Sequence, residues 1–178
     1  MQIPQPLDPV DAVKEAFSGT VQDVKTFRGE TTIILDRASI VSVLRFLRDT
    51  PGLVYNYLSD ISAVDYYPDY NRPERFGVVY HIYSMLYNRR LTVKVFVPED
   101  DTTVPTATGI WMAANYLERE IFDMMGITFD GHPDMRRILM PEDWDGYPAR
   151  RDYPLGYETV QFSFNYDEVS KHKPFAKE

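Results

Sequence analysis

Residues 75–97 read RFGVVYHIYSMLYNRRLTVKVFV, and this stretch decides the class of fold. Its two halves are rich in Tyr, Val and Ile, which favour β-strands, and Asn88-Arg89-Arg90 separates them as a turn. From 91 to 97, Leu and Val alternate with Thr, Lys and Phe, which is typical of a strand with one buried face. We therefore predict two strands, over 75–86 and 91–97, joined by a turn.

The sequence upstream of this stretch predicts further strands and two helices. Asp8-Pro9 is typical of a helix start, and helical spacing of apolar residues continues to about 18. A second helix is expected from Ile40 to the breaker Thr50-Pro51-Gly52. The predicted strands are 21–27 and 31–35, joined by a turn at 28–30, and 53–64, followed by a proline-containing loop at 66–73.

Downstream, a third helix is predicted to begin near Thr106, after an acidic, polar loop over 98–105. Its core-facing stripe has helical spacing and consists of Ile110, Ala114, Leu117, Ile121 and Met124. Residues 1–130 are therefore predicted to form one α+β domain, with a mostly antiparallel or mixed β-sheet and about three helices packed on it.

Residues 131–178 contain five prolines and no sustained apolar periodicity, so we expect an extended C-terminal segment. The segment is also rich in aromatic residues, and such an apolar area needs to be buried somewhere. The surface that buries it is either its own domain or a partner, and we expect this segment to dock on a partner subunit.

The composition of the 178 residues excludes several classes of function. A net charge of −8 opposes binding to nucleic acids, and the absence of cysteine excludes thiolate-bound iron-sulfur clusters and a cysteine nucleophile. The absence of cysteine also excludes disulfides, which is compatible with a reducing cytoplasm. No apolar run is long enough to cross a bilayer, and the N-terminus does not resemble a secretion signal.

Two carboxylates with helical spacing, Glu120 and Asp123, are candidates for acid-base chemistry or for ion pairing. Arg119 can pair with Asp123 at a spacing of four residues. Catalysis needs environments that separate the two pKa values, and spacing alone does not indicate this. We expect ion pairing with one of the downstream arginines, which are Arg136, Arg137, Arg150 and Arg151.

The histidines offer only weak candidates for metal ligands. His132 could bind a metal with Asp130 and Asp134, but a turn in which these side chains anchor the backbone is the preferred interpretation. We expect His81 to be a hydrogen-bonded core residue and His172 to be exposed.

No nucleotide-binding or serine-nucleophile motif occurs in the sequence. The arginine pairs flank Trp144 and Tyr147, as in some nucleic-acid-binding proteins, but neighbouring carboxylates cancel their charge. Arg, Trp and Tyr together suit a protein interface better.

The segment from 118 to 158 resembles the signature of the 30-kDa subunit family of respiratory complex I. The matching stretches are EREIFDMMGI at 118–127, Phe129, GHP at 131–133, RIL at 137–139, DW at 143–144, Gly146, Pro148 and RRDYPLGYE at 150–158. Met125, Tyr147 and Ala149 depart from the residues common in the family, and none of these departures removes a charged signature residue.

The resemblance implies a non-catalytic, cofactor-free subunit of the hydrophilic arm of NADH:quinone oxidoreductase, a complex that couples electron transfer to proton translocation. It implies a location on the cytoplasmic face of the membrane beside the 49-kDa-like subunit, with FMN and iron-sulfur clusters in partner subunits. The resemblance assigns no catalytic, cofactor-binding or metal-binding residue. Its signature and interface residues are Glu118, Arg119, Glu120, Asp123, Gly126, Gly131, His132, Pro133, Arg137, Trp144, Arg150, Arg151, Asp152 and Pro154.

Two alternatives stay open at this point. The first is the equivalent subunit of a membrane-bound hydrogenase or of a ferredoxin-dependent complex. The second, more distant, is a stand-alone acid-base or metal enzyme that uses Glu120, Asp123 and His132.

Overall fold

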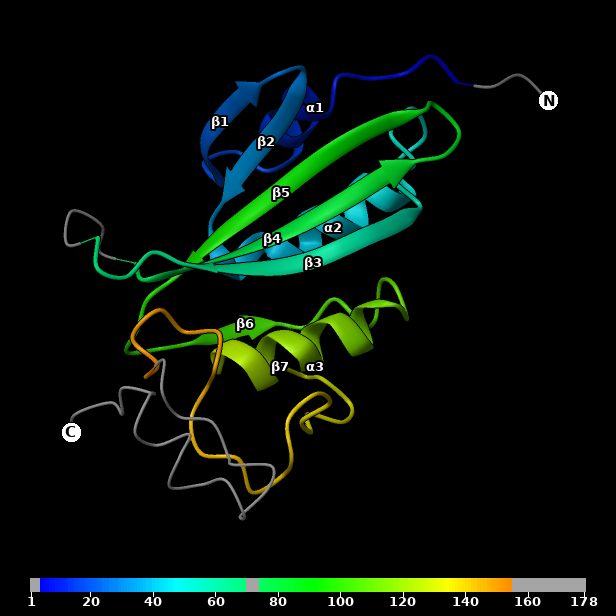
Figure 1. The fold of residues 1–178 in the computed structure, drawn as a ribbon. Helices are drawn as coiled ribbons and strands as arrows, with labels where there is room; N and C mark the ends of the chain where they lie inside the picture. The colour runs from blue at the N-terminus through cyan, green and yellow to red at the C-terminus, as the bar shows by residue number, and fades with distance from the viewer. Residues whose placement is uncertain (1–3, 70–73, 155–178) are drawn as a thin grey trace, which may run out of the picture.

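A five-stranded mixed sheet lies at the centre of the computed structural model, which describes residues 4–69 and 74–154 (Figure 1). The strand order is β1-β2-β5-β4-β3, and every neighbouring pair is antiparallel except β2 and β5, which are parallel. The strands are β1 (Val21–Phe27), β2 (Glu30–Leu35), β3 (Tyr57–Asp65), β4 (Phe76–Ser84) and β5 (Arg89–Val97). The predicted α+β class with a mixed sheet is confirmed.

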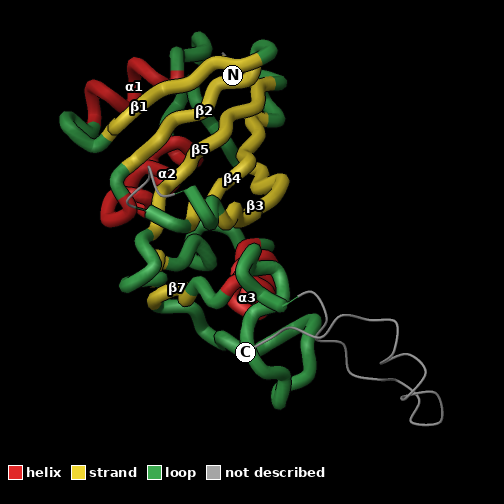
Figure 2. The backbone as a smooth tube through the Cα atoms, turned by 60° about the vertical axis from the view of Figure 1, so that its left-hand side comes forward, coloured by secondary structure: helices red, strands yellow, loops and turns green. Residues whose placement is uncertain are grey.

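In the described residues, three α-helices accompany the sheet, and α1 and α2 lie on one of its faces (Figure 2). They are α1 (Pro9–Ala16), α2 (Ile40–Asp49), which follows the short 3-10 helix η1 (Arg37–Ser39), and α3 (Ala114–Met125). The side chain of Asp8 accepts hydrogen bonds from the first backbone N–H groups of α1, which confirms the predicted helix start.

The hydrophobic core lies between α2 and the sheet. The core face of α2 consists of Ile40, Val43, Leu44 and Leu47, all fully buried. On β5, Leu91, Val93, Val95 and Val97 are buried, whereas Thr92, Lys94 and Phe96 are half-buried on the other face. The alternation predicted for 91–97 is therefore confirmed, and it decides which face of the sheet meets α2.

The turn between β1 and β2 consists of Arg28 and Gly29, both with positive φ. Positive φ at both central residues matches the twist of a two-residue hairpin, and glycine adopts it without steric cost. The predicted hairpin is confirmed.

Three predicted boundaries were wrong. The turn predicted at 88–90 lies at 85–88, since β4 ends at Ser84 and β5 begins at Arg89. The strand predicted from 53 begins at Tyr57, because Leu53, Val54 and Tyr55 fold back on α2 through hydrogen bonds to Thr50 and Leu47. The helix predicted from 106 begins at Ala114, because residues 107–113 form turns.

A small parallel sheet was missed by the sequence analysis. Strand β6 (Thr103–Pro105) lies in the predicted polar loop, and it pairs with β7 (Thr128–Asp130), which follows α3. Each strand has only three residues, too few for a periodicity signal.

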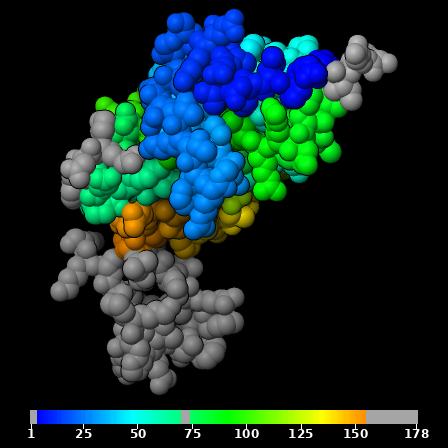
Figure 3. Space-filling model, turned by 90° about the horizontal axis from the view of Figure 1, so that it is seen from above, coloured from blue at the N-terminus to red at the C-terminus, as the bar shows by residue number. Residues whose placement is uncertain are grey.

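Residues 131–154 form no helix or strand and pack against α3 and the end of the large sheet. Figure 3 shows this segment in yellow and orange against the strands, at the end of the molecule away from the dark blue α1. In the described ranges, 4–69 and 74–154, no helix is long and apolar enough to span a membrane.

Candidate docking site

The buried carboxylate of Asp123, near the end of α3, fixes the loop that follows β7. Its Oδ2 accepts hydrogen bonds from three successive backbone N–H groups, of Ile138 at 3.0 Å, Leu139 at 2.7 Å and Met140 at 2.8 Å. Its Oδ1 accepts a charged hydrogen bond of 2.7 Å from Nη1 of Arg137. Successive backbone N–H groups form a concave anion-binding site, here occupied by a side chain of the same protein. We call residues 137–140 the anchored loop.

These hydrogen bonds also keep Asp123 ionised. Complete burial would raise the pKa of its carboxyl group, but the N–H of Met140, the guanidinium of Arg137 and the other two amides outweigh burial. The pKa of Asp123 is therefore held below its ordinary value. Because the anion is the bound form, the loop depends on charge rather than on apolar packing.

Two arginines connect the anchored loop to α3 and to later residues. Arg119 on α3 donates to the carbonyl oxygens of Arg136 and Arg137, each at 3.0 Å. Nη2 of Arg137 donates to the carbonyl oxygens of Trp144 and Gly146, each at 3.1 Å. A guanidinium with several donors can bridge backbone groups that no regular ladder satisfies.

The last carbonyl groups of α3 find their partners in other segments, mostly in residues 137–150. A helix leaves its final carbonyls without intrahelical partners, so each needs another donor. The carbonyl oxygen of Asp123 accepts from Nη1 of Arg137 at 3.1 Å, and that of Met124 accepts from the N–H of Ala149 at 2.9 Å. The carbonyl oxygen of Met125 accepts from Nε of Arg150 at 2.7 Å, and that of Gly126 accepts from the Thr102 hydroxyl at 3.1 Å. The two arginine cations at this end also suit the helix dipole.

Gly126 is required at the end of α3 for two reasons. Its φ of 73° ends the helix in the left-handed region. A Cβ atom there would lie 2.5 Å from the ring of Tyr147 and 2.7 Å from Nη2 of Arg150. The guanidinium of Arg150 stacks over Tyr147, 4.6 Å from the ring centroid. Arg150, expected at a partner interface, thus has its contacts within this chain.

The pairing of Arg119 with Asp123, which their spacing allowed, does not occur. Arg119 pairs with backbone carbonyls rather than with Asp123, and Glu120 is exposed whereas Asp123 is buried. The predicted pairing of an α3 carboxylate with a downstream arginine is confirmed by Asp123 and Arg137.

His132 anchors a turn, as preferred from the sequence. Its Nδ1 accepts the N–H of Asp134 at 3.0 Å, so Nε2 carries the proton and donates to the carbonyl of Asn115 at 3.1 Å. Asp134 pairs with Arg136 at 2.6 Å. Among the described residues, no group of three or more His, Cys, Asp or Glu side chains could hold a metal ion.

His81 was predicted in the core, but it is half-buried on the face of β4 opposite α2, where Nδ1 lies 3.1 Å from Oγ1 of Thr92. His172 lies outside the described residues.

Of the other signature residues, Trp144 is half-buried, and Gly131, Pro133, Arg151 and Pro154 are exposed.

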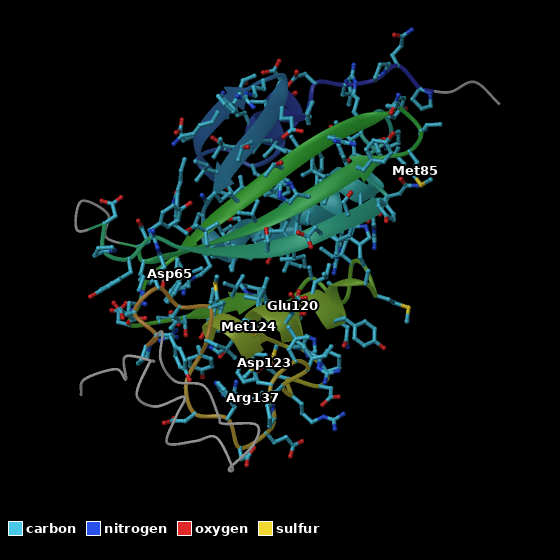
Figure 4. All side chains as sticks on the ribbon, in the orientation of Figure 1. Asp65, Met85, Glu120, Asp123, Met124 and Arg137 are labelled. Atoms are coloured by element: carbon cyan, nitrogen blue, oxygen red, sulfur yellow. The ribbon has the colours of Figure 1, made fainter. Side chains whose placement is uncertain are left out.

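A second charged cluster, which the sequence analysis did not predict as a site, holds residues 151–152 against the end of β3. Arg75 is only 9% exposed and binds Asp65 at 2.9 Å, Asp152 at 2.6 Å and Glu99 at 2.6 Å. The N–H of Arg151 donates to Asp65 at 2.9 Å. Figure 4 shows Asp65 and Asp123 at separate places in this part of the molecule. Residues 131–154 are thus fixed at two points.

The pKa of Asp65 is lowered in the same manner as that of Asp123. Burial alone would raise it, but hydrogen bonds from Arg75 and from the N–H groups of Tyr67 and Arg151 outweigh burial. No local pattern marks this cluster, since Asp65 and Asp152 are distant in sequence.

Glu118, on the buried face of α3, has a structural role. It is fully buried, and its carboxyl group accepts hydrogen bonds from the Thr106 hydroxyl at 2.5 Å and from the N–H of Ala107 at 2.7 Å. Burial raises the pKa of Glu118 to about 7, although these two hydrogen bonds act in the opposite direction. Glu118 therefore fixes the turns before α3.

The anchored loop presents apolar side chains to solvent. Ile138 is 39% exposed and Leu139 is 59% exposed, although their backbone N–H groups are bound to buried Asp123. Tyr116 on α3 and Met112 before it are also strongly exposed. Exposed apolar side chains on a fixed backbone are typical of a protein interface.

Comparison with known proteins identifies the class to which this α+β fold and its C-terminal segment belong. The chain belongs to the family described as respiratory-chain NADH dehydrogenase, 30 Kd subunit, which matches residues 33–159.

The similarity to individual proteins extends over most of the chain. It is 49% identical over 167 residues to an NADH-quinone oxidoreductase subunit of Roseiflexus sp. (strain RS-1), covering 94% of this chain and 92% of that one. It is 36% identical to the solved trypsin-resistant fragment (1-134) of Nqo5, with a TM-score of 0.61, covering 71% of this chain and 99% of that one. A chain of the membrane-bound sulfane sulfur reductase, an archaeal respiratory membrane complex, shares the fold at 22% identity, with a TM-score of 0.68 and coverage of 95% and 94%.

Proposed function

We propose that this chain is a cofactor-free structural subunit of the hydrophilic arm of an NADH:quinone oxidoreductase. Its role is assembly beside the quinone-reducing subunits, with the 49-kDa-like subunit as its direct neighbour. The complex couples electron transfer from NADH to quinone with proton translocation, and this chain catalyses no step by itself. Membership of the family, and a relative named as a subunit of NADH-quinone oxidoreductase, support this proposal.

One observation carries the structural role, namely the anchored loop. Three backbone N–H groups and Arg137 converge on Asp123, so Ile138 and Leu139 are held outward in one geometry. A loop that is ordered before binding loses less conformational entropy when a partner covers it. This arrangement suits a docking element better than a catalytic one.

The location of the cofactors follows from residue chemistry. A chain without cysteine cannot supply the thiolates that hold iron-sulfur clusters, so we assign the clusters to partner subunits. We assign FMN to partner subunits because of the membership of the family. The chain is attached peripherally, at the cytoplasmic face of the membrane, through these partners.

The related complexes remain the second candidate. The shared fold of a chain from one membrane-bound sulfane sulfur reductase supports keeping this candidate. Purification of the native complex decides between them, because flavin and NADH-oxidising subunits accompany the chain only in the first case.

Leu139→Glu tests the docking role. The change places a charge on the exposed side chain without touching Asp123, so the isolated chain should keep its melting temperature. Recovery of the 49-kDa-like subunit with the tagged chain should fall at least about tenfold, which corresponds to about 1.4 kcal/mol. Activity per assembled complex should stay near normal.

Leu86→Glu is the matched control, because Leu86 is a similarly exposed leucine, 47% exposed, between β4 and β5. This variant should retain the partner. Undiminished recovery with Leu139→Glu, or equal loss with both variants, would contradict the docking role of the anchored loop.

A further inference from the structure

Glu118 differs from Asp65 and Asp123, the other buried carboxyl groups of the described residues, because no cation of that part of the chain binds it. Its hydrogen-bond partners are the Thr106 hydroxyl and the N–H of Ala107. Burial raises the pKa of Glu118 to about 7 against the effect of these two hydrogen bonds. A buried carboxylate without an opposite charge is costly, so Glu118 exchanges its proton in a pH range in which the other two stay ionised.

Two threonine hydroxyls allow Glu118 to exist with or without its proton. The Thr106 hydroxyl lies 2.5 Å from Oε2 of Glu118 and 3.0 Å from the hydroxyl of Thr108. A hydroxyl group donates one hydrogen bond and accepts two. An ionised Glu118 can therefore accept from Thr106, whereas a protonated Glu118 can donate to Thr106, which then donates to Thr108. This hydrogen bond is kept in both protonation states.

Tyr80 brings another hydroxyl to Glu118 from the sheet. Its side chain is fully buried on β4, and its hydroxyl has no hydrogen-bond partner among the described residues. Tyr80 pairs with Ile61 on β3, the strand that lies beside α3 (Figure 1). Ile61 and Ile121 line the same groove, and Ile121 lies one helical turn after Glu118. Burial raises the pKa of the Tyr80 phenol, and the charge of Glu118 raises it further, because the two groups lie close together.

Charged side chains also lie on the other elements packed around Glu118. Among them are Arg48 of α2, which donates to a carbonyl oxygen of the turns before α3 at 2.7 Å, Asp60 of β3, Glu120 of α3 and Asp130 of β7. None of them is among the causes that set the pKa of Glu118, which are burial and its two hydrogen bonds. The phenol on β4 is therefore the titratable group that faces Glu118 from the sheet.

We infer that Glu118, Thr106 and Tyr80 form a proton-dependent latch between α3 and the large sheet. With its proton, Glu118 holds the turns at 107–113 closed through the N–H of Ala107. When the proton leaves to solvent, the Tyr80 hydroxyl turns to the carboxylate and donates to it. The turns then open more often, because water stabilises the charge better than the core does. The latch acts within this chain and needs no partner subunit.

Hydrogen exchange of the full chain at pH 6 and pH 8, corrected for the intrinsic effect of pH, tests this latch. The pKa of Glu118 is about 7 when buried and 4.5 when exposed, so opening should become about tenfold more frequent between these pH values. We expect protection at 107–113 to fall by this factor, with β4 and β5 still protected. Glu118→Gln should abolish the fall. Protection that does not change with pH, or an equal fall in Glu118→Gln, would overturn the latch.

Tyr80→Phe tests the role of the phenol. Phenylalanine fills the same space without the hydroxyl, so protection at 107–113 should stay close to that of the unmodified chain at pH 6. At pH 8 the carboxylate has lost a donor, and protection should be at least about threefold lower than in the unmodified chain. The infrared band of the protonated carboxyl group, assigned by its loss in Glu118→Gln, should persist to a pH about one unit higher, a tenfold change in proton affinity.

Tyr55→Phe is the matched control. Tyr55 is also buried in the core, at 2% exposure, and its pKa is raised by burial and shifted by Arg89 and Asp8 rather than by Glu118. This variant should change neither the infrared midpoint nor the ratio of protection between pH 6 and pH 8. Equal effects of the two Phe variants, or a Tyr80→Phe variant that titrates like the unmodified chain, would overturn the inferred role of Tyr80 and with it the latch.

Discussion

The large sheet with α2 and the α3 region with residues 131–154 are stabilised by different interactions. The interface between the sheet and α2 consists of aliphatic and aromatic side chains, and its backbone groups are satisfied by regular ladders. In the α3 region, Glu118 and Asp123 are buried and bind backbone N–H groups. Asp65, at the end of β3, binds the N–H of Arg151 in the same way.

The difference follows from the lack of regular structure after β7. Residues 131–154 form no ladder, yet their polar backbone groups still need partners when they are partly buried. Buried carboxylates and arginines supply these partners. Because their hydrogen bonds are directional, only one course of the backbone satisfies them. Apolar packing stabilises the large sheet and α2 without directional bonds, whereas the hydrogen bonds of the charged groups fix the geometry of the anchored loop.

The largest expected effect is that of Asp123→Ala. Removing this carboxylate leaves Arg137 and three backbone N–H groups without their partner, and breaking a buried pair costs about 3–5 kcal/mol. We expect rapid hydrogen exchange and tryptic cleavage at residues 136–137, with the sheet still protected.

Two variants bracket this result. Leu44→Ala in the core should lower the free energy of unfolding by a similar amount, about 2–5 kcal/mol. Unlike Asp123→Ala, it should lower the hydrogen-exchange protection of the large sheet as well. Asp134→Ala, which removes an exposed partner of Arg136, should leave both regions protected. If Asp123→Ala unfolded the sheet and the loop together, the two regions would not be energetically distinct.

Next in size is Arg75→Met, which tests the second anchoring point. The change leaves Asp65 buried without its cation, and we expect a loss of about 3 kcal/mol in the free energy of unfolding. Residues 151–152 should become accessible to protease while the anchored loop stays protected.

The double variant Asp65→Leu/Arg75→Met is the control, because an apolar pair can replace a buried ion pair at little cost. It should recover part of the stability in denaturant unfolding. A double variant less stable than Arg75→Met would show that Asp65 acts mainly through the N–H groups of Tyr67 and Arg151.

The sequence predicted the sheet well and the charged region only in part, for a physical reason. Alternation in 91–97 and the turn at Arg28-Gly29 are local signals, because each depends on neighbouring residues. The pair of Asp123 with Arg137 was among the predicted possibilities, but spacing favoured Arg119 for Asp123 as well. Which arginine binds depends on how the loop returns to α3, which periodicity does not encode.

The cluster around Arg75 was beyond prediction for the same reason. Asp65 and Asp152 meet only after the C-terminal segment has returned to the sheet. The start of α3 was also misplaced because the side chain of Glu118 holds the N–H of Ala107 in a turn, and this competes with continued helix.

A smaller effect, which depends on pH, is expected at Glu118. Its pKa is raised to about 7 in the folded protein from an ordinary value of 4.5, so the folded state binds the proton more tightly. This contribution is fully present below pH 4.5 and is lost as the pH rises through 7, which amounts to about 2 kcal/mol between pH 5 and pH 8.

Glu118→Gln removes this titration while keeping an acceptor for the N–H of Ala107. Urea unfolding at both pH values should show that the variant lacks this loss of stability. The pKa values of Asp65 and Asp123 are lowered from 3.8, so their contributions change only in more acidic solution. Equal pH dependence in both proteins would show that Glu118 is ionised at pH 5.

The smallest expected effect is that of Thr102→Val, at the junction of the two regions. The Thr102 hydroxyl donates to the carbonyl of Gly126, just after α3, so its loss removes one hydrogen bond and costs about 1 kcal/mol. Because the other carbonyls at this end keep Arg137, Ala149 and Arg150 as partners, the anchored loop should stay protected in hydrogen exchange. Thr103→Val, at an exposed neighbouring position, is the matched control and should change stability less. Exposure of the anchored loop by Thr102→Val would mean that the end of α3 and the loop are ordered only together, and that Asp123 alone does not hold the loop.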